Sequence, residues 1–188
     1  MKGKAIIVSA PSGAGKTTIV RHLMERGLGL AFSVSATTRP MRASERDGHD
    51  YHFLAIEEFK RRIAAHEFVE WEEVYPGRFY GTLRDEVKRI ESEGLHPVFD
   101  VDVEGGLRLK SFFGTNGLAL FIAPPHPQAL VDRLTKRGTE TAQSLQMRVD
   151  KALHELTYAP RFDRIVVNDD LIGACAEAEA LVRAFLGS

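Results

Sequence analysis

Cysteine is almost missing from this sequence, since Cys175 is the only one among 188 residues. A single thiol can form neither an intrachain disulfide nor a thiolate metal cluster, which fits a reducing compartment. Long apolar runs are missing too, because none approaches the roughly 20 residues that a membrane-spanning helix needs. The run at residues 5–8 is too short for the core of a signal peptide and lacks a cleavage pattern. We therefore expect a cytoplasmic protein with no membrane partner.

An excess of charge is also lacking: 25 Lys and Arg against 26 Asp and Glu leave a formal net charge of −1. This balance gives no general reason to bind nucleic acid, so any binding of anions has to come from local arginines. The seven histidines are dispersed without metal-ligand spacing, and none of them is assigned a site. The sequence contains no repeat at a fixed period. Its length fits one domain with a well-buried core.

Apolar runs alternate with helical patterns along much of the chain. The alternation is typical of βαβ units, in which helices cover both faces of a parallel sheet. We therefore expect an α/β fold, a P-loop three-layer sandwich with a mainly parallel central sheet. The last helix is expected to bury a stripe formed by Leu171, Cys175, Ala178, Val182 and Phe185. The expected strands cover residues 5–8, 98–101, 118–123 and 165–167, and the expected helices cover residues 19–23, 107–113, 130–134 and 171–185.

Two segments depart from this alternation. Between residues 33 and 83, short polar-aromatic strands surround one helix on which Ile56, Phe59 and Ile63 share a face. Residues 127–160 are helical in pattern, with a break expected near residues 138 and 139. Two lobes on one sheet suggest a clamp. The expected division of the single domain is a core of residues 1–34, 83–126 and 160–188, an inserted lobe of residues 35–82, and a helical lid of residues 127–159.

The stretch SAPSGAGKTT, residues 9–18, lies where the first strand turns into the first helix. A glycine-rich turn at this place lets successive backbone N–H groups face one phosphate, and the helix N-terminus adds partial positive charge. Lys16 can then reach the outer phosphates of a triphosphate, while the Thr17 hydroxyl is placed to bind Mg²⁺. The alternative is an ordinary turn with a solvated lysine. The residues expected to bind ATP are Ser12, Gly13, Ala14, Gly15, Lys16, Thr17 and Thr18.

The strict form of this motif has glycine where the chain has Ala10. This departure matters only if the residue needs a positive φ. We expect alanine to be tolerated here.

The stretch FSVSATTRPMR contains two arginines three residues apart, and guanidinium groups match phosphate oxygens in bidentate fashion. A solvated polar loop is the other interpretation. The chain resembles guanylate kinases over nearly all 188 residues, because a series of stretches occurs in the order seen in that family. Besides SAPSGAGKTT and FSVSATTRPMR, these stretches are DGHDYHF, FVEWEEVYPGRFYGT, FDVDVEGG, FIAPP, RLTKRGTET and VVNDDL. The resemblance implies a nucleoside monophosphate kinase core with a GMP-binding lobe and a lid. It also implies transfer of phosphate from ATP to GMP, giving ADP and GDP (and dGDP), with Mg²⁺ as cofactor.

By the same resemblance, four positions would hold the GMP phosphate and four would recognise guanine. Guanine presents N1–H and its 2-amino group as adjacent donors, which a carboxylate such as Glu70 can accept as a pair. Its O6 favours a hydroxyl donor such as Ser35 or Thr82, and adenine offers no such donor edge. From position alone, Glu70 could equally be an exposed strand residue beside Trp71, and Tyr51 and Tyr80 could equally be partly buried packing. The phosphate set is Arg39, Arg42, Tyr51 and Tyr80, and the guanine set is Ser35, Glu70, Thr82 and Asp102.

Asp100 and Asp102 end the apolar strand PVFDVD on the same face, where an open parallel sheet places its ligands. Asp100 would face Mg²⁺ together with Thr17, and Asp102 would face the base; a polar strand end is the alternative. By resemblance Asn168 lies near adenine. Glu104 stands where the family usually has glutamine, so it is left out of the catalytic set. That set is Lys16, Arg39, Arg42 and, from the lid, Arg133, Arg137 and Arg148, although lid arginines can also pair with acidic neighbours on helix surfaces.

Two other functions are compatible with this scaffold. A non-catalytic binding module related to guanylate kinases would be expected to lack a working phosphate loop, which is present here. A kinase acting on ribose 1,5-bisphosphate would be expected to lack the guanine set, which is also present. The sequence leaves the oligomeric state open.

Overall fold

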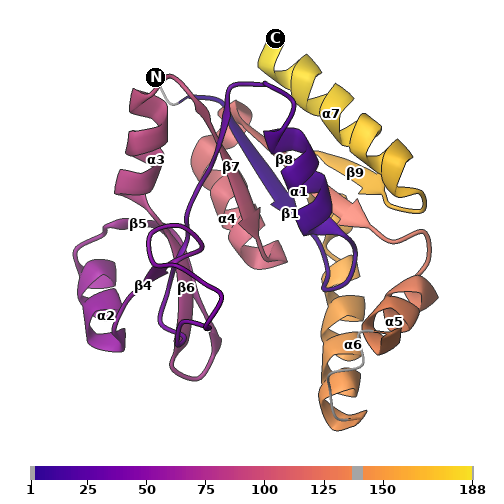
Figure 1. Ribbon diagram of the computed structural model, residues 1–188, viewed down its shortest axis with the longest axis horizontal. Helices are drawn as coiled ribbons and strands as arrows, with labels where there is room; N and C mark the ends of the chain where they lie inside the picture. Colours follow the sequence, from indigo (N-terminus) through magenta and orange to yellow (C-terminus); the bar gives the residue numbers. More distant parts are fainter. Residues whose placement is uncertain (1–2, 137–141, 188) are drawn as a thin grey trace.

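A parallel sheet forms the centre of the computed structural model, which describes residues 3–136 and 142–187 (Figure 1). Five strands lie in the order β2-β7-β1-β8-β9, and every neighbouring pair is parallel. The expected α/β fold with a mainly parallel sheet is therefore confirmed. The strands are β1 (Ala5–Ser9), β2 (Leu30–Phe32), β7 (His96–Val101), β8 (Gly117–Ala123) and β9 (Arg164–Val167).

Helices cover both faces of this sheet because successive side chains of a strand point to opposite sides. Ile6 and Val8 of β1 pack into one buried cluster, whereas Ile7 packs into another. The cluster around Ile6 includes side chains of α1 (Lys16–Met24), α5 (Pro127–Lys136), α6 (Ala142–Leu156) and α7 (Leu171–Gly187). The cluster around Ile7 includes side chains of α3 (Arg84–Ser92) and α4 (Val103–Phe113). These three layers are the sandwich that the sequence predicts. Two short 3-10 helices, Gly114–Asn116 and Ala159–Arg161, complete the core.

A second, smaller sheet is inserted between β2 and α3. It has four strands in the order β4-β3-β6-β5. Its core is aromatic, since the Phe59 ring lies 4.4 Å from that of Phe68 and 5.5 Å from that of Phe79 between centroids. Ile56 and Ile63 pack against the same cluster, so the expected apolar face of this helix is present. The elements are β3 (Ala36–Thr37), β4 (His52–Phe53), α2 (Ile56–Ala64), β5 (Phe68–Tyr75) and β6 (Arg78–Leu83).

The sequence patterns miss two elements of the core and misplace one side chain. β2 has three residues, and α3 buries only Val87 and Ile90 among its apolar side chains, so neither gives a strong periodic signal. Leu171, expected in the buried stripe of α7, is 42% exposed. It is the first residue of the helix, just past the edge strand β9, where the sheet no longer covers it. Among the described residues, no helix is both long and apolar enough to cross a membrane.

The strand order places two functional stretches side by side. β1 pairs with β7 so that Ser9 lies opposite Val101, and both strands end at this edge of the sheet. The Ser9 hydroxyl donates a hydrogen bond to the backbone oxygen of Asp102, 3.0 Å away, and so links the segments that follow β1 and β7. The loop after β1 and the acidic residues at the end of β7 therefore border the same space. In Figure 1 this edge faces the second sheet and the α5–α6 pair, and both chain ends lie on the opposite side.

The close contact between α4 and β1 depends on Gly106. A methyl group at this position would lie 2.2 Å from Ser9 Oγ and 3.3 Å from Phe162 Cε1. We expect Gly106→Ala to lower the free energy of unfolding by about 1–3 kcal/mol, because overpacking a filled contact forces neighbours apart. Urea denaturation measures this loss. Gly173→Ala in α7 is the control, since its methyl meets only Asp170 Oδ2 at 3.2 Å. Equal stability of the two variants would contradict the assigned packing.

Candidate active site

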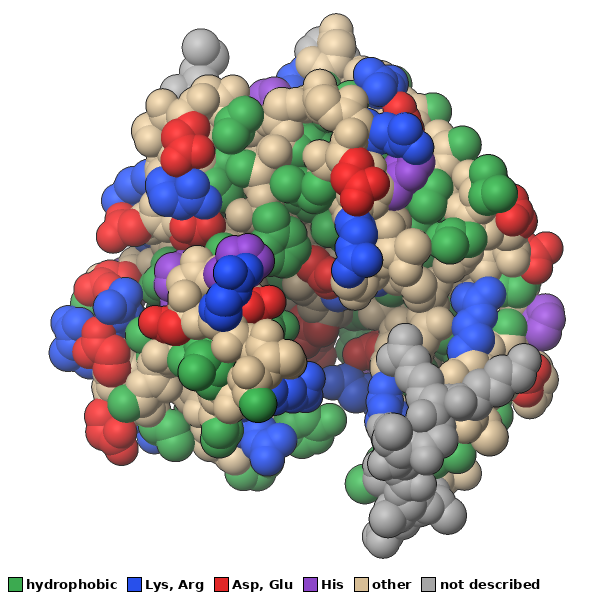
Figure 2. All heavy atoms as spheres, viewed as in Figure 1, with side chains coloured by type: hydrophobic (Ala, Val, Ile, Leu, Met, Phe, Trp, Pro, Cys, Tyr) green, Lys and Arg blue, Asp and Glu red, His purple; other side chains and the backbone are tan. Residues whose placement is uncertain are grey.

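Two cavities meet at the carboxyl edge of the central sheet. The first, here called the loop cavity, is lined by residues 10–18 together with side chains of α6 and has a volume of about 430 Å³. The second, the lobe cavity, lies between that edge and the inserted sheet and has a volume of about 380 Å³. Figure 2 shows a hollow between the inserted lobe and the rest of the molecule, with acidic side chains deep inside it and Lys or Arg side chains along its border. Both volumes suit small ligands.

The loop after β1 has the backbone that its glycines predict. Gly13 has φ +91° and Gly15 has φ +96°, in the left-handed region that other residues rarely adopt. In the described part of the chain, His66 alone has a positive φ among residues other than glycine, so Ala10 does not need one. The backbone at position 10 is therefore compatible with alanine. α1 begins at Lys16, directly behind this loop, and its N-terminus faces the loop cavity.

Asn168 lies behind the loop rather than in a cavity. Its side-chain amide donates a hydrogen bond to the backbone oxygen of Ala14 at 2.7 Å, and the residue is 5% exposed. A methyl group at Gly15 would come within 2.3 Å of the same amide nitrogen. The resemblance implies a place near adenine for Asn168, which stays a prediction, and its described contact fixes the shape of the loop.

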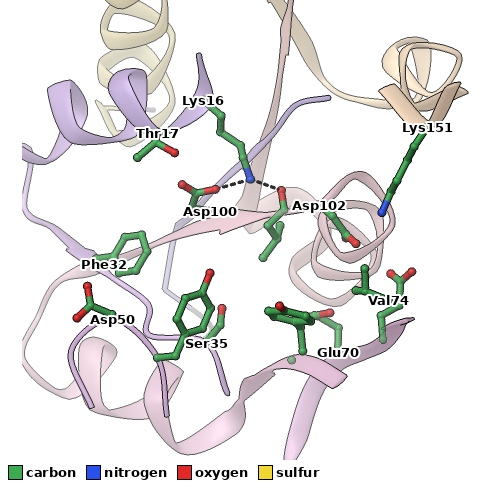
Figure 3. A pocket seen from close by; sticks show the side chains of 15 residues that line it. Lys16, Thr17, Phe32, Ser35, Asp50, Glu70, Val74, Asp100, Asp102 and Lys151 are labelled. Carbon is green, nitrogen blue, oxygen red and sulfur yellow. Dashed lines mark hydrogen bonds and ion pairs between the residues drawn. The ribbon is translucent and has the colours of Figure 1, made fainter. Parts of the chain in front are cut away.

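Lys16 connects the loop to β7. Its ammonium group forms an ion pair with Asp100 and donates to the backbone oxygen of Val101 at 2.7 Å (Figure 3). The side chain thus lies across the boundary of the two cavities and lines both of them. Thr17 is exposed and also lines both cavities. A cation and a hydroxyl are therefore available where anionic ligands from either side would meet.

The two aspartates at the end of β7 both line the lobe cavity, but in different ways. Asp100 belongs to the strand and pairs with Lys16. Asp102 follows the strand and caps α4, because its carboxylate accepts a hydrogen bond from the backbone N–H of Gly105 at 2.7 Å. Within the described residues, no group of three or more His, Cys, Asp or Glu could hold a metal ion. A metal that takes most of its ligands from a bound phosphate and water, as Mg²⁺ does, remains compatible with Thr17 and Asp100.

A buried carboxyl group forms one wall of the lobe cavity. Glu70 lies opposite Thr82 in the β5–β6 ladder, so the two side chains share a face of the small sheet. The Thr82 hydroxyl donates to Glu70 Oε1 at 2.7 Å, and Thr82 itself is fully buried. Burial raises the pKa of the Glu70 carboxyl to about 7, and the neighbouring Asp102 carboxylate adds to this shift. Glu70 therefore gains or loses its proton much closer to neutral pH than an exposed glutamate does.

Five of the eight residues expected to contact GMP are brought together around the lobe cavity. They are Ser35, Tyr51, Glu70, Tyr80 and Asp102. The Tyr51 and Tyr80 rings meet edge to face, with centroids 6.1 Å apart. Burial, followed by the proximity of Tyr80, raises the pKa of the Tyr51 hydroxyl, which keeps it a neutral donor. Thr82 does not line the cavity itself but bonds to Glu70, which does.

The two arginines of the 37–50 loop lie beside the lobe cavity rather than along its wall. Glu45 accepts two hydrogen bonds from the Arg39 guanidinium, at 2.7 Å and 2.5 Å, and a third from the backbone N–H of Arg42 at 2.9 Å. The guanidinium carbon of Arg39 lies 4.9 Å from the centroid of the Tyr51 ring. Hydrogen bonding from Arg39 lowers the pKa of Glu45 to about 2.

Sequence reasoning did not single out Glu45. Its hydrogen bonds hold Arg39 beside Tyr51 of the cavity wall. Glu45 therefore orients the arginine that is expected to bind the GMP phosphate. The only signal in the sequence is its spacing, three residues after Arg42 in a polar loop.

The α5–α6 pair approaches the loop cavity through its arginines. Arg148 of α6 donates to Ser12 Oγ at 2.8 Å and lines this cavity. Arg133 of α5 donates to the backbone oxygen of Asn168 at 2.9 Å, outside both cavities. Arg137 and the break expected at Gly138 and Thr139 lie outside the described residues.

Glu104, which the sequence analysis leaves out of the catalytic set, lines neither cavity. It is exposed and accepts a hydrogen bond from Arg108 at 3.1 Å. Arg108 also donates to the backbone oxygen of Trp71 at 3.0 Å and to Glu72 at 3.3 Å, so the pair joins α4 to β5. The structure therefore gives no reason to add Glu104 to the site.

Comparison with known proteins agrees with this geometry. A profile of the family described as guanylate kinase matches residues 2–185. Curated relatives include the guanylate kinase of Bacteroides thetaiotaomicron, 48% identical over 99% of this chain and 91% of that protein, and that of Salinibacter ruber, 50% identical over 97% of each. The crystal structure of guanylate kinase from Anaplasma phagocytophilum superposes with a TM-score of 0.78 at 26% identity, covering 99% of this chain and 87% of that one.

The raised pKa of Glu70 predicts a pH-dependent cost to stability. Glu70 keeps its proton up to about pH 7 in the folded state, whereas it releases the proton near pH 4.5 in the unfolded chain. The free energy of unfolding therefore falls as the pH rises from about 4.5 towards 7. We expect Glu70→Gln to raise the free energy of unfolding by roughly 1–3 kcal/mol at pH 8 and by much less at pH 5. Urea denaturation at both pH values measures the difference.

The matched control for this measurement is Glu57→Gln, which alters an exposed glutamate of α2. It should leave stability unchanged at both pH values. An equal effect of Glu70→Gln at pH 5 and pH 8 would show that Glu70 is not protonated in the folded chain.

Proposed function

The chain belongs to the guanylate kinase family, and from this premise we propose that it transfers the γ-phosphoryl group of ATP to GMP, giving ADP and GDP. The observation that carries the proposal is the junction of two cavities at Lys16. One cavity is built from a phosphate-binding loop, and the other has the buried carboxyl of Glu70 in its wall. Two anionic substrates can thus meet end to end beside a fixed cation.

Glu70 would select guanine over the other bases. Its ionised carboxylate accepts the N1–H and 2-amino protons together, while Thr82 holds the carboxyl group in place from the opposite side. Ser35 can donate to O6, and Asp102 lies near enough to take part in base recognition. A site whose buried polar groups stay unpaired with the wrong base discriminates by about 10⁴-fold.

Arg39, Arg42, Tyr51 and Tyr80 would hold the GMP phosphate. A guanidinium group has five N–H donors, so Arg39 can keep its bonds to Glu45 and still present donors to a phosphate. The neutral tyrosine hydroxyls add donors without further positive charge. Bound in this way, the GMP phosphate is already an anionic nucleophile, and no general base is required.

Residues 12–18 would hold the ATP phosphates, with Asn168 fixing the loop behind them. Lys16 would exchange its ion pair with Asp100 for the phosphates, and this would free the Asp100 carboxylate. Thr17 and Asp100 would then hold Mg²⁺, which when bound supplies further neutralisation of phosphate charge. Arg133, Arg137 and Arg148 would add positive charge from the other side.

The domain division follows from these roles. Residues 35–82 would form the GMP-binding lobe, residues 127–159 a lid over ATP, and the remainder the core. Closure of the lid would exclude water and protect ATP from hydrolysis in the absence of GMP. The proposed location is cytoplasmic, which is compatible with the bacterial guanylate kinases that the chain resembles. The presence of both the phosphate loop and the guanine set argues against a non-catalytic module and against a ribose bisphosphate kinase.

The proposal predicts ADP release that depends on GMP. The purified protein with Mg²⁺–ATP is mixed separately with GMP, AMP, UMP, CMP or ribose 1,5-bisphosphate. We expect rapid turnover with GMP alone, at least about 10²-fold loss in Lys16→Ala because a charge on the phosphates is removed, and lost base preference in Glu70→Ala. Lys88→Ala, an exposed lysine of α3, is the control and should match the parent protein.

Two results would reject the proposal. Turnover with ribose 1,5-bisphosphate alone would mean that the lobe cavity holds a different acceptor. Binding of GMP without any turnover would point to a binding module.

A further inference from the structure

Four residues line both cavities: Lys16, Thr17, Asp102 and Lys151. The first three belong to the set that the sequence predicts. Lys151 does not, because a lysine on a helix surface carries no motif. Lys16 and Lys151 are the two cationic residues in this shared set. The position of Lys151 therefore raises the question of what its ammonium group does there.

Lys151 approaches the shared space from α6, whereas Lys16 enters it from α1 (Figure 3). Its side chain is 47% exposed. Its ammonium nitrogen lies 3.8 Å from Glu155 Oε1 on the same helix and 5.9 Å from the centroid of the Tyr75 ring on β5. The ammonium group of Lys151 thus lies between Glu155 of α6 and Tyr75 of the inserted lobe.

The contact with Glu155 orients the ammonium group without occupying it. At 3.8 Å this is an ion pair rather than a hydrogen bond, so the N–H donors can turn to a phosphate oxygen. Glu155 lines the loop cavity, and its side chain is only 12% exposed. The shielded Glu155 side chain thus keeps the ammonium group of Lys151 near the junction of the two cavities.

The chemistry of transfer requires positive charge at this place. The γ-phosphorus loses its bond to the β-phosphate oxygen, whose electrons stay on ADP, and forms a bond to an oxygen of the GMP phosphate. The group in transit crosses the space that the two cavities share. Asp102 and the nearby Glu72 make this space acidic, while Lys16 serves one side of it. A second cation on the other side would neutralise the phosphoryl oxygens.

We propose that Lys151 is a catalytic residue, whose ammonium group binds an oxygen of the phosphoryl group as it passes between the two cavities. The proposal rests on the proposed function, since it concerns the same transfer from ATP to GMP. Lys151 stays protonated throughout and forms no covalent bond. Its contribution is electrostatic and is largest when charge is spread over the moving group.

Lys60 offers a matched control. Its ammonium nitrogen lies 5.8 Å from the centroid of the Phe79 ring, so it makes the same kind of aromatic contact as Lys151. It is exposed on α2 and lines neither cavity. Lys60→Met therefore removes an equivalent lysine away from the phosphates.

The test compares Lys151→Met, Lys151→Arg and Lys60→Met with the parent protein in steady-state and single-turnover assays. We expect Lys151→Met to lower kcat about 10- to 100-fold, with KM for GMP and for ATP changed by less than about threefold. Lys151→Arg should recover most of this loss, and Lys60→Met should show none. Equal melting temperatures of the variants would separate the effect from folding. Affinity for ADP, GMP and aluminium fluoride together, which mimic the moving phosphoryl group, should fall as kcat does in Lys151→Met.

Two outcomes would overturn the proposal. A kcat of Lys151→Met within about twofold of that of Lys60→Met would make Lys151 a surface lysine. A rise in KM for one nucleotide at unchanged kcat would restrict it to binding that nucleotide before transfer. A parent protein without GMP-dependent turnover would instead refute the proposed function, so the two failures are distinguishable.

Discussion

The ion pair between Lys16 and Asp100 joins the two halves of the site. It exists because β1 and β7 are neighbours in a parallel sheet, so the loop that follows one strand borders the acidic end of the other. The same pairing balances charge while the cavities hold no phosphate. Without Lys16, the Asp100 carboxylate would lose its ion-pair partner beside the carboxylate of Asp102. Binding of phosphates can draw the lysine away only by offering it a stronger anion, which couples occupation of the loop cavity to release of Asp100.

Burial of Glu70 sets a second constraint, which acts against stability. The small sheet encloses a carboxyl group that ionises reluctantly, while Thr82 restricts its orientation. A ligand with two adjacent N–H donors satisfies the ionised form, and a ligand without them does not. Under the proposed function, selectivity for the base would come from the same desolvation of Glu70 that lowers the stability of the inserted lobe. Glu45 would play a comparable part for the GMP phosphate, since it holds Arg39 beside Tyr51.

The sequence predicts the features that periodicity or a local motif determines. Alternating apolar runs identify β1, β7, β8 and β9, and the loop glycines adopt the positive φ that the motif requires. Features set by tertiary contact are less accessible: β2 and α3 are short or polar, and Leu171 is exposed because the sheet ends beside it. Residues that act through another residue are hardest to find. Glu45 and Lys151 carry no motif, and Asn168 and Thr82 show their main contacts only in the folded chain.

The central claim is that a buried, partly protonated Glu70 recognises guanine, and proton release on GMP binding tests it most directly. Titration calorimetry at pH 7 in buffers of different ionisation enthalpy counts the protons released. The parent protein should release roughly half a proton more than Glu70→Gln, because guanine stabilises the ionised carboxylate. The phosphate site is unchanged in this variant and cancels from the comparison. Equal proton release by the two proteins would contradict the account.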